Sequence, residues 1–128
     1  MKALKLIPEI KILLVEDEAH ISALIRETLK IDPRVNICGE VDNAKDAIEV
    51  AKQTQPDVIV LDHYIEGDVM GMQAAPLIKV AAPNAKIILF TSHIFTFKDL
   101  RNAVIDSYLS KTAMQDLLKT AQNLAGVE

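Results

Sequence analysis

Ile12-Leu13-Leu14-Val15-Glu16-Asp17 is a short apolar run that ends in two acids. A second run, Val58-Ile59-Val60-Leu61, ends in Asp62 in the same way. Short aliphatic runs of this kind are typical of strands that are buried on both faces of a parallel sheet. Ligands bind beyond the carboxyl ends of the strands in open α/β sheets. We therefore expect the three carboxylates to share one site.

Apolar runs alternate with segments of helical period along the rest of the chain. The predicted strands are Ile10–Val15, Val35–Cys38, Val58–Leu61, Ile87–Phe90 and Tyr108–Leu109. Helical faces recur between and after them, around residues 21–28, 44–51, 72–80, 98–105 and 114–125. Alternating strands and helices predict a parallel sheet with right-handed crossovers. Pro76 falls inside the third helical segment, where it removes an amide donor and is expected to bend or shorten the helix.

Length and composition narrow the class of protein. The chain has 128 residues, 50% of them hydrophobic, and a formal net charge of -4. This size fits one compact domain, and the negative charge argues against direct nucleic-acid binding by this domain. No apolar run approaches membrane-spanning length, and the amino terminus lacks the long apolar region of a signal peptide. The single cysteine, Cys38, favours a reducing, cytoplasmic setting.

The residue types at the strand ends point to metal-assisted chemistry on a carboxylate. Three carboxylates close together do not all ionise readily without a counter-cation. Thr91 and Lys111 follow the two later apolar runs and add a hydroxyl and an amine to the same edge. Mg²⁺ prefers oxygen ligands, and an aspartate can accept a phosphoryl group covalently.

With these residues assembled, the chain resembles the receiver domain of bacterial two-component response regulators. Four segments carry the likeness: Ile12-Leu13-Leu14-Val15-Glu16-Asp17-Glu18, Pro56-Asp57-Val58-Ile59-Val60-Leu61-Asp62, Ile88-Leu89-Phe90-Thr91-Ser92 and Tyr108-Leu109-Ser110-Lys111. The stretch from Ile31 to Glu40 is similar to the nitrate-regulator (LuxR-type) subfamily. The likeness runs from about Lys11 to Ala125 and implies a single receiver domain over residues 1–128.

The resemblance implies a flavodoxin-like, doubly wound α/β fold, with a five-stranded parallel sheet in order 2-1-3-4-5 and five flanking helices. It implies that Asp62 accepts a phosphoryl group from a histidine kinase or a phosphotransfer protein. Glu16, Asp17, Asp62 and the backbone carbonyl of Tyr64 would hold Mg²⁺ or Mn²⁺. Thr91 and Lys111 would bind the phosphoryl oxygens, and Tyr108 would be the aromatic switch. Tyr64 and His93 would frame the approach of the water that hydrolyses the phosphoryl group.

The implied role is signalling through a protein-binding surface, and not conventional enzymatic turnover. An output domain, an effector protein or a second copy of the chain would read the phosphorylated state. The sequence names neither the kinase nor the pathway, and it does not say whether an output domain follows Glu128. No membrane partner is expected.

Departures from the family pattern keep a second reading open. Glu66 stands where the family usually has a proline, Thr112 follows Lys111 where proline is frequent, and the stretch from Thr91 to Tyr108 is slightly short. The departures around Glu66 and the fourth helix motivate the alternative of a pseudo-receiver, a binding module that phosphate does not control. An enzyme is the third possible function. A flavin-binding enzyme does not fit, because the acids after the first strand would repel the flavin phosphate. A haloacid-type phosphatase would need an aspartate where Tyr64 stands.

Overall fold

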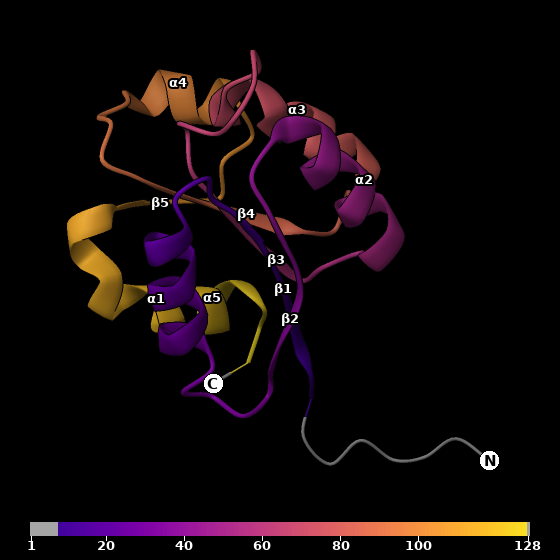
Figure 1. Ribbon diagram of the computed structural model, residues 1–128, viewed down its shortest axis with the longest axis vertical. Coiled ribbons are helices and arrows are strands. Elements are labelled where there is room, and N and C mark those ends of the chain that lie inside the picture. The colour runs from indigo at the N-terminus through magenta and orange to yellow at the C-terminus, as the bar shows by residue number, and fades with distance from the viewer. Residues whose placement is uncertain (1–7, 128) are drawn as a thin grey trace.

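The computed structural model describes residues 8–127 and places five strands and their helices in strict alternation (Figure 1). The parallel sheet has the order β2-β1-β3-β4-β5, as the sequence predicts. Its strands are β1 (Ile10–Val15), β2 (Val35–Val41), β3 (Val58–Leu61), β4 (Lys86–Thr91) and β5 (Ser107–Ser110). The helices are α1 (Ala19–Leu29), α2 (Ala44–Thr54), α3 (Gly71–Ala81), α4 (Phe97–Asn102), the 3-10 helix η1 (Lys111–Asp116) and α5 (Leu117–Leu124).

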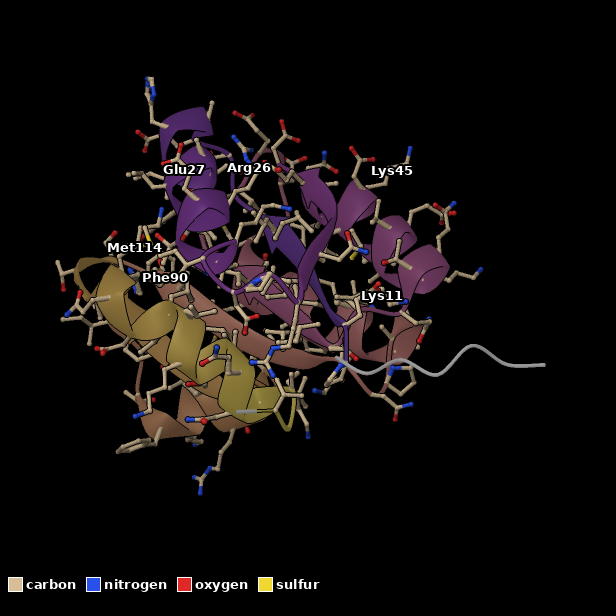
Figure 2. The ribbon with its side chains drawn as sticks, turned by 90° about the horizontal axis from the view of Figure 1, so that it is seen from below. Lys11, Arg26, Glu27, Lys45, Phe90 and Met114 are labelled. Atoms are coloured by element: carbon tan, nitrogen blue, oxygen red, sulfur yellow. The ribbon has the colours of Figure 1, made fainter. Side chains whose placement is uncertain are left out.

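Helices cover both faces of the sheet, which explains the continuous apolar character of the central strands. Alternate residues of β1, β3 and β4 point into two separate clusters. One cluster packs against α2 and α3, and the other against α1 and α5, which lie on opposite sides of the sheet in Figure 1. Phe90 and Met114, labelled in Figure 2, belong to the cluster on the side of α1 and α5.

Several element boundaries differ from those predicted. β2 continues three residues past Cys38 to Val41, and the single helix predicted over 114–125 is divided into η1 and α5. Of the expected bending or shortening at Pro76, the shortening is wrong, because α3 runs for 11 residues through Pro76, and the bending stays a prediction. Pro76 removes only the amide that would bond Met72, while α3 buries Ala74, Ala75 and Ile78. Burial of that face outweighs the lost bond.

α4 ends earlier than the predicted Ile105, and the backbone shows why. Val104 adopts a φ of 56°, the left-handed conformation that usually falls to glycine after a helix. Its N–H donates to the carbonyl of Arg101 at 3.1 Å, and the N–H of Ile105 donates to that of Leu100 at 3.0 Å. These two bonds form a Schellman ending. A valine at the left-handed position gives no sequence signal for it.

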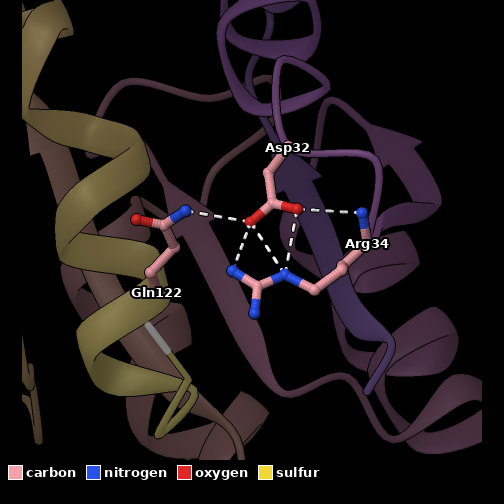
Figure 3. Close-up of polar contacts among 3 residues, drawn as sticks. All are labelled: Asp32, Arg34 and Gln122. Carbon is pink, nitrogen blue, oxygen red and sulfur yellow. Dashed lines mark hydrogen bonds and ion pairs between the residues drawn. The ribbon is translucent and has the colours of Figure 1, made fainter. Parts of the chain in front are cut away.

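A buried acid ties the loop after α1 to the C-terminal helix (Figure 3). Asp32 accepts from the backbone N–H of Arg34 at 2.9 Å and from its guanidinium Nη2 at 2.7 Å. Gln122 of α5 donates to the same carboxylate at 2.9 Å. The bonds from Arg34, and next the bond from Gln122, hold the pKa of Asp32 well below its usual range. This acid therefore has a structural role.

Candidate functional site

Two adjacent central strands deliver the acids to one edge of the sheet. β1 and β3 pair in parallel with Val15 opposite Leu61, so Glu16 and Asp62 leave the sheet side by side. The N–H of Asp62 still donates to the carbonyl of Val15 at 3.0 Å, which fixes the backbone beneath the carboxylate. Rigid strand ends thus position both acids.

Glu16, Asp17 and Asp62 form one cluster at this edge. One carboxylate oxygen from each lies within 4.8 Å of the others. Glu16 and Asp62 are buried, and Asp17 is exposed. The structure therefore brings together the three acids that the sequence predicts as metal ligands. The fourth predicted ligand, the carbonyl of Tyr64, stays a prediction.

Lys111 joins the cluster from the neighbouring end of β5. Its Nζ donates to Asp62 Oδ2 at 2.7 Å and to Glu16 Oε1 at 3.1 Å. Burial is the strongest influence and lowers the pKa of Lys111, but the bonds to Asp62 and Glu16 outweigh it and leave that pKa raised. The amine is thus charged and neutralises part of the acidic cluster.

The remaining carboxylate oxygens are not satisfied. Glu16 Oε2 and Asp62 Oδ1 are buried and have no hydrogen-bond partner among the described residues. Burial first, and then the charge of Asp62, raise the pKa of Glu16 to about 7 despite Lys111. Buried polar atoms are nearly always partnered in folded proteins, so unpartnered oxygens mark a place for a ligand. Anionic oxygens of this kind are the donors that a hard divalent cation prefers.

Thr91 ends β4 and is fully buried beside this cluster. Its Oγ1 accepts from the backbone N–H of His93 at 3.3 Å. Tyr108 of β5 is half-buried, and its hydroxyl donates to the backbone carbonyl of His93 at 2.8 Å. The hydroxyl and the aromatic residue of the predicted switch are therefore linked through one loop residue.

Tyr64 and His93 form a contact between two loops next to the acidic cluster. The Tyr64 hydroxyl lies 2.8 Å from His93 Nδ1, which joins the loop after β3 to the loop after β4. The His63 ring lies against those of Tyr64 and His93, and the Phe95 ring lies against that of His93 and 4.9 Å from that of His63. Burial, and then His93, lower the pKa of His63. The sequence placed Tyr64 and His93 near the acceptor, but it did not predict this hydrogen bond.

Sequence reasoning missed the role of Gly71. The first residue of α3 lies against the backbone of Asp62, and a Cβ there would collide with the Asp62 carbonyl and with the Cα of His63. Its N–H donates to the carbonyl of His63 at 2.7 Å. Any side chain at this position would displace the acceptor, so only glycine fits. A glycine directly before a predicted helix was the available signal.

The loop between β3 and α3 is anchored at Glu66, the position where the family usually has proline. Its N–H donates to the carbonyl of Asp42 at 2.8 Å, and Glu66 forms an isolated bridge with Asn43. A proline could not donate this bond. Glu66 therefore docks the loop on the residues that precede α2.

Comparison with known proteins identifies the family. Residues 12–123 match the model of the response regulator receiver domain. The chain belongs to this family. It is 33% identical over 105 residues to the response regulator protein VraR of Staphylococcus saprophyticus, covering 80% of this chain and 50% of VraR. The chain thus spans about half the length of this relative.

Solved structures agree on the fold. The NarL signal receiver domain from Mycobacterium tuberculosis superposes with a TM-score of 0.85 at 20% identity, covering 95% of this chain and 100% of that one. The isolated receiver domain of RcsB from Salmonella enterica serovar Typhimurium, solved with the phosphomimetic BeF3-, gives 0.81 at 22% identity, with 94% and 91% covered. The predicted receiver fold is confirmed.

Within residues 8–127, no helix is both long and apolar enough to cross a bilayer.

Proposed function

We propose that this receiver accepts a phosphoryl group on Asp62 in a metal-dependent phosphorelay. The observation that carries the proposal is the pair of buried, unpartnered oxygens, Glu16 Oε2 and Asp62 Oδ1, within a three-acid cluster. A structural ion-pair site would have these atoms bonded. A site that receives a cation and a phosphoryl group leaves them available.

Each residue of the site has a role in the transfer. A carboxylate oxygen of Asp62 attacks the phosphorus of a phosphohistidine, the O–P bond forms, and the P–N bond to the donor breaks. Lys111, already within 2.7 Å of Asp62, pairs with the added negative charge. Thr91 donates its hydroxyl hydrogen to a phosphoryl oxygen. Phosphoryl transfer depends mainly on such positioning and charge neutralisation.

The predicted cation fits the donors present. Glu16, Asp17 and Asp62, with the backbone carbonyl of Tyr64, would hold Mg²⁺ or Mn²⁺. Oxygen ligands and several retained waters suit Mg²⁺. When bound, the ion would neutralise charge on the transferred group.

The partners follow from the proposed chemistry. The donor is a histidine kinase or a phosphotransfer protein in the cytoplasm. The reader is an output domain, an effector protein or a second copy of the chain. The chain is a phosphoacceptor that assists its own phosphorylation and dephosphorylation, and it does not turn over a separate substrate.

The alternative is a pseudo-receiver that phosphate does not control. Two departures from the family pattern motivate it: Glu66 in the loop before α3, and the short α4, which ends at Asn102. A protein of that kind would use its surface for binding without accepting phosphate. The experiment below separates the two functions.

The test is a phosphodonor assay read by intact mass. Incubation with acetyl phosphate and Mg²⁺ is expected to add one phosphoryl group to the wild type. Asp62→Asn and EDTA should each abolish the gain. Asp57→Asn, at the opposite end of β3, is the matched control and should retain it. A gain that survives in Asp62→Asn, or that ignores EDTA, contradicts the assignment, and no gain at all supports the pseudo-receiver.

A further inference from the structure

His93 is held from three sides by residues of the candidate site. Its backbone N–H bonds Thr91 Oγ1, its carbonyl accepts from the Tyr108 hydroxyl, and its Nδ1 bonds the Tyr64 hydroxyl. Both tyrosines of the chain therefore bond the same residue. Tyr64 comes from the loop after β3, Tyr108 comes from β5, and His93 connects them.

The three bonds are unequal. Both tyrosine hydroxyls lie 2.8 Å from their His93 atoms, whereas the His93 N–H lies 3.3 Å from Thr91 Oγ1. Shorter distances within the usual range indicate better-formed bonds. His93 is therefore held more firmly by the tyrosines than by Thr91, the last residue of β4.

Contacts with neighbouring aromatic rings also hold the His93 side chain in place. The His93 ring lies 4.5 Å from that of Phe95 and 5.5 Å from that of His63. His63 and Tyr64 directly follow the acceptor in sequence, so the cluster fastens the β4–α4 loop to the acceptor loop. Tyr64 is 46% exposed and His93 is also exposed. A bond at this rim adds little to global stability, but it can bias the position of a loop.

We propose that the Tyr64–His93 hydrogen bond acts as a latch, which holds the β4–α4 loop in its unphosphorylated position. Phosphorylation of Asp62 must break this bond. The inference rests on the proposed function, because the new bond from Thr91 to a phosphoryl oxygen supplies the opposing pull. That pull draws the fully buried Thr91 toward Asp62, whereas the Tyr64 hydroxyl holds His93 at the exposed surface. A ligand shifts such an equilibrium only by interacting differently with the two states. Tyr64 and His93 are positioning residues in this account.

The experiment measures binding of beryllofluoride, a phosphoryl mimic, in the presence of Mg²⁺. Tyr64→Phe keeps the ring and removes the bond, so its affinity for beryllofluoride should rise by about twofold to tenfold. His93→Phe should raise it similarly. The double variant should gain no more than either single one, because both remove the same bond.

Tyr108→Phe is the matched control, since it removes the other hydroxyl from the same residue. The Tyr108 hydroxyl bonds the backbone of His93, so its effect should persist in a His93→Phe background. The effect of Tyr64→Phe should vanish in that background. An effect of Tyr64→Phe that is undiminished there would overturn the latch.

A second readout needs no phosphoryl mimic. Amide hydrogen exchange over residues 92–96 should be faster in Tyr64→Phe than in the wild type, with the thermal midpoint unchanged. If the wild type fails to bind beryllofluoride, the proposed function fails, and hydrogen exchange still tests the hold on the loop. If the wild type binds it, equal or weaker binding by Tyr64→Phe overturns the latch.

Discussion

Asp32 and the pair Glu16–Asp62 are buried to similar degrees, with exposed fractions of 8%, 6% and 3%, yet their surroundings are opposite. Both Asp32 oxygens accept hydrogen bonds from Arg34, and one also accepts from Gln122. Glu16 and Asp62 share one lysine, and each retains a bare oxygen. The pKa of Asp32 is held low, whereas that of Glu16 is raised to about 7. Hydrogen bonds dominate the pKa of Asp32, whereas burial and the charge of Asp62 dominate that of Glu16, which keeps an unpartnered oxygen in the proposed ligand site.

The largest expected effect is on Mg²⁺ affinity. Asp17→Asn should weaken binding by about 100-fold or more, since losing even an outer-shell partner often costs about 10- to 100-fold. Glu16→Gln should weaken it less, because Lys111 already offsets the charge of Glu16. Asp32→Asn should leave it unchanged. Calorimetric titration of the three variants tests the order, and wild-type affinity in Asp17→Asn would refute the metal assignment.

The next effect concerns the lifetime of the phosphoryl group. Tyr64 and His93 are bulky side chains on the two loops beside the acceptor, and neither offers a carboxylate or an amide to orient water. Replacing Tyr64 with Asn and His93 with Glu together should speed hydrolysis by about tenfold, because positioning a reactant strongly affects rate. Phosphate loss is followed after donor removal. Decay of the wild type at the rate of the double variant would show that these side chains do not restrain the water.

A smaller effect is expected at Asp32, both of whose carboxylate oxygens are hydrogen-bonded. Asp32→Ala removes the acceptor of several hydrogen bonds, so it should lower the free energy of unfolding by about 1–3 kcal/mol. Mg²⁺ affinity and phosphorylation should not change. Urea unfolding measures the free energy of unfolding. Calorimetric titration measures Mg²⁺ affinity, and the phosphodonor assay measures phosphorylation. Impaired phosphorylation in a folded Asp32→Ala protein would erase the distinction between the two acidic sites.

The smallest effect is the pH dependence of that stabilisation. The folded pKa of Asp32 lies below its ordinary value of 3.8, so the folded state binds fewer protons there than the unfolded state. The contribution of Asp32 is therefore present above about pH 4 and declines as the pH falls further. The stability difference between wild type and Asp32→Ala should shrink from pH 5 to pH 3. A constant difference would show that the carboxylate charge is not the source.

Much of the fold and the acidic cluster could be predicted because the signals are local. Aliphatic runs that end in Glu16 and Asp62 specify both the strand and the edge where each acid emerges. The link from Asp32 to α5 gave no such signal, since Gln122 lies 90 residues away, although its other partner, Arg34, is close in sequence. The sequence did not predict where α4 ends, because Val104 occupies a position that is usually glycine. The link between Tyr64 and His93 depends on how two loops pack, which no local pattern encodes.

The most direct test is to trap and locate the phosphoryl group. Borohydride reduces an aspartyl phosphate to homoserine, and peptide mass spectrometry then identifies the converted residue. After treatment with acetyl phosphate, we predict conversion of Asp62 alone, only when Mg²⁺ is present, with the equally buried Asp32 untouched. Conversion at another acid, or none at Asp62 in the presence of Mg²⁺, would contradict the account.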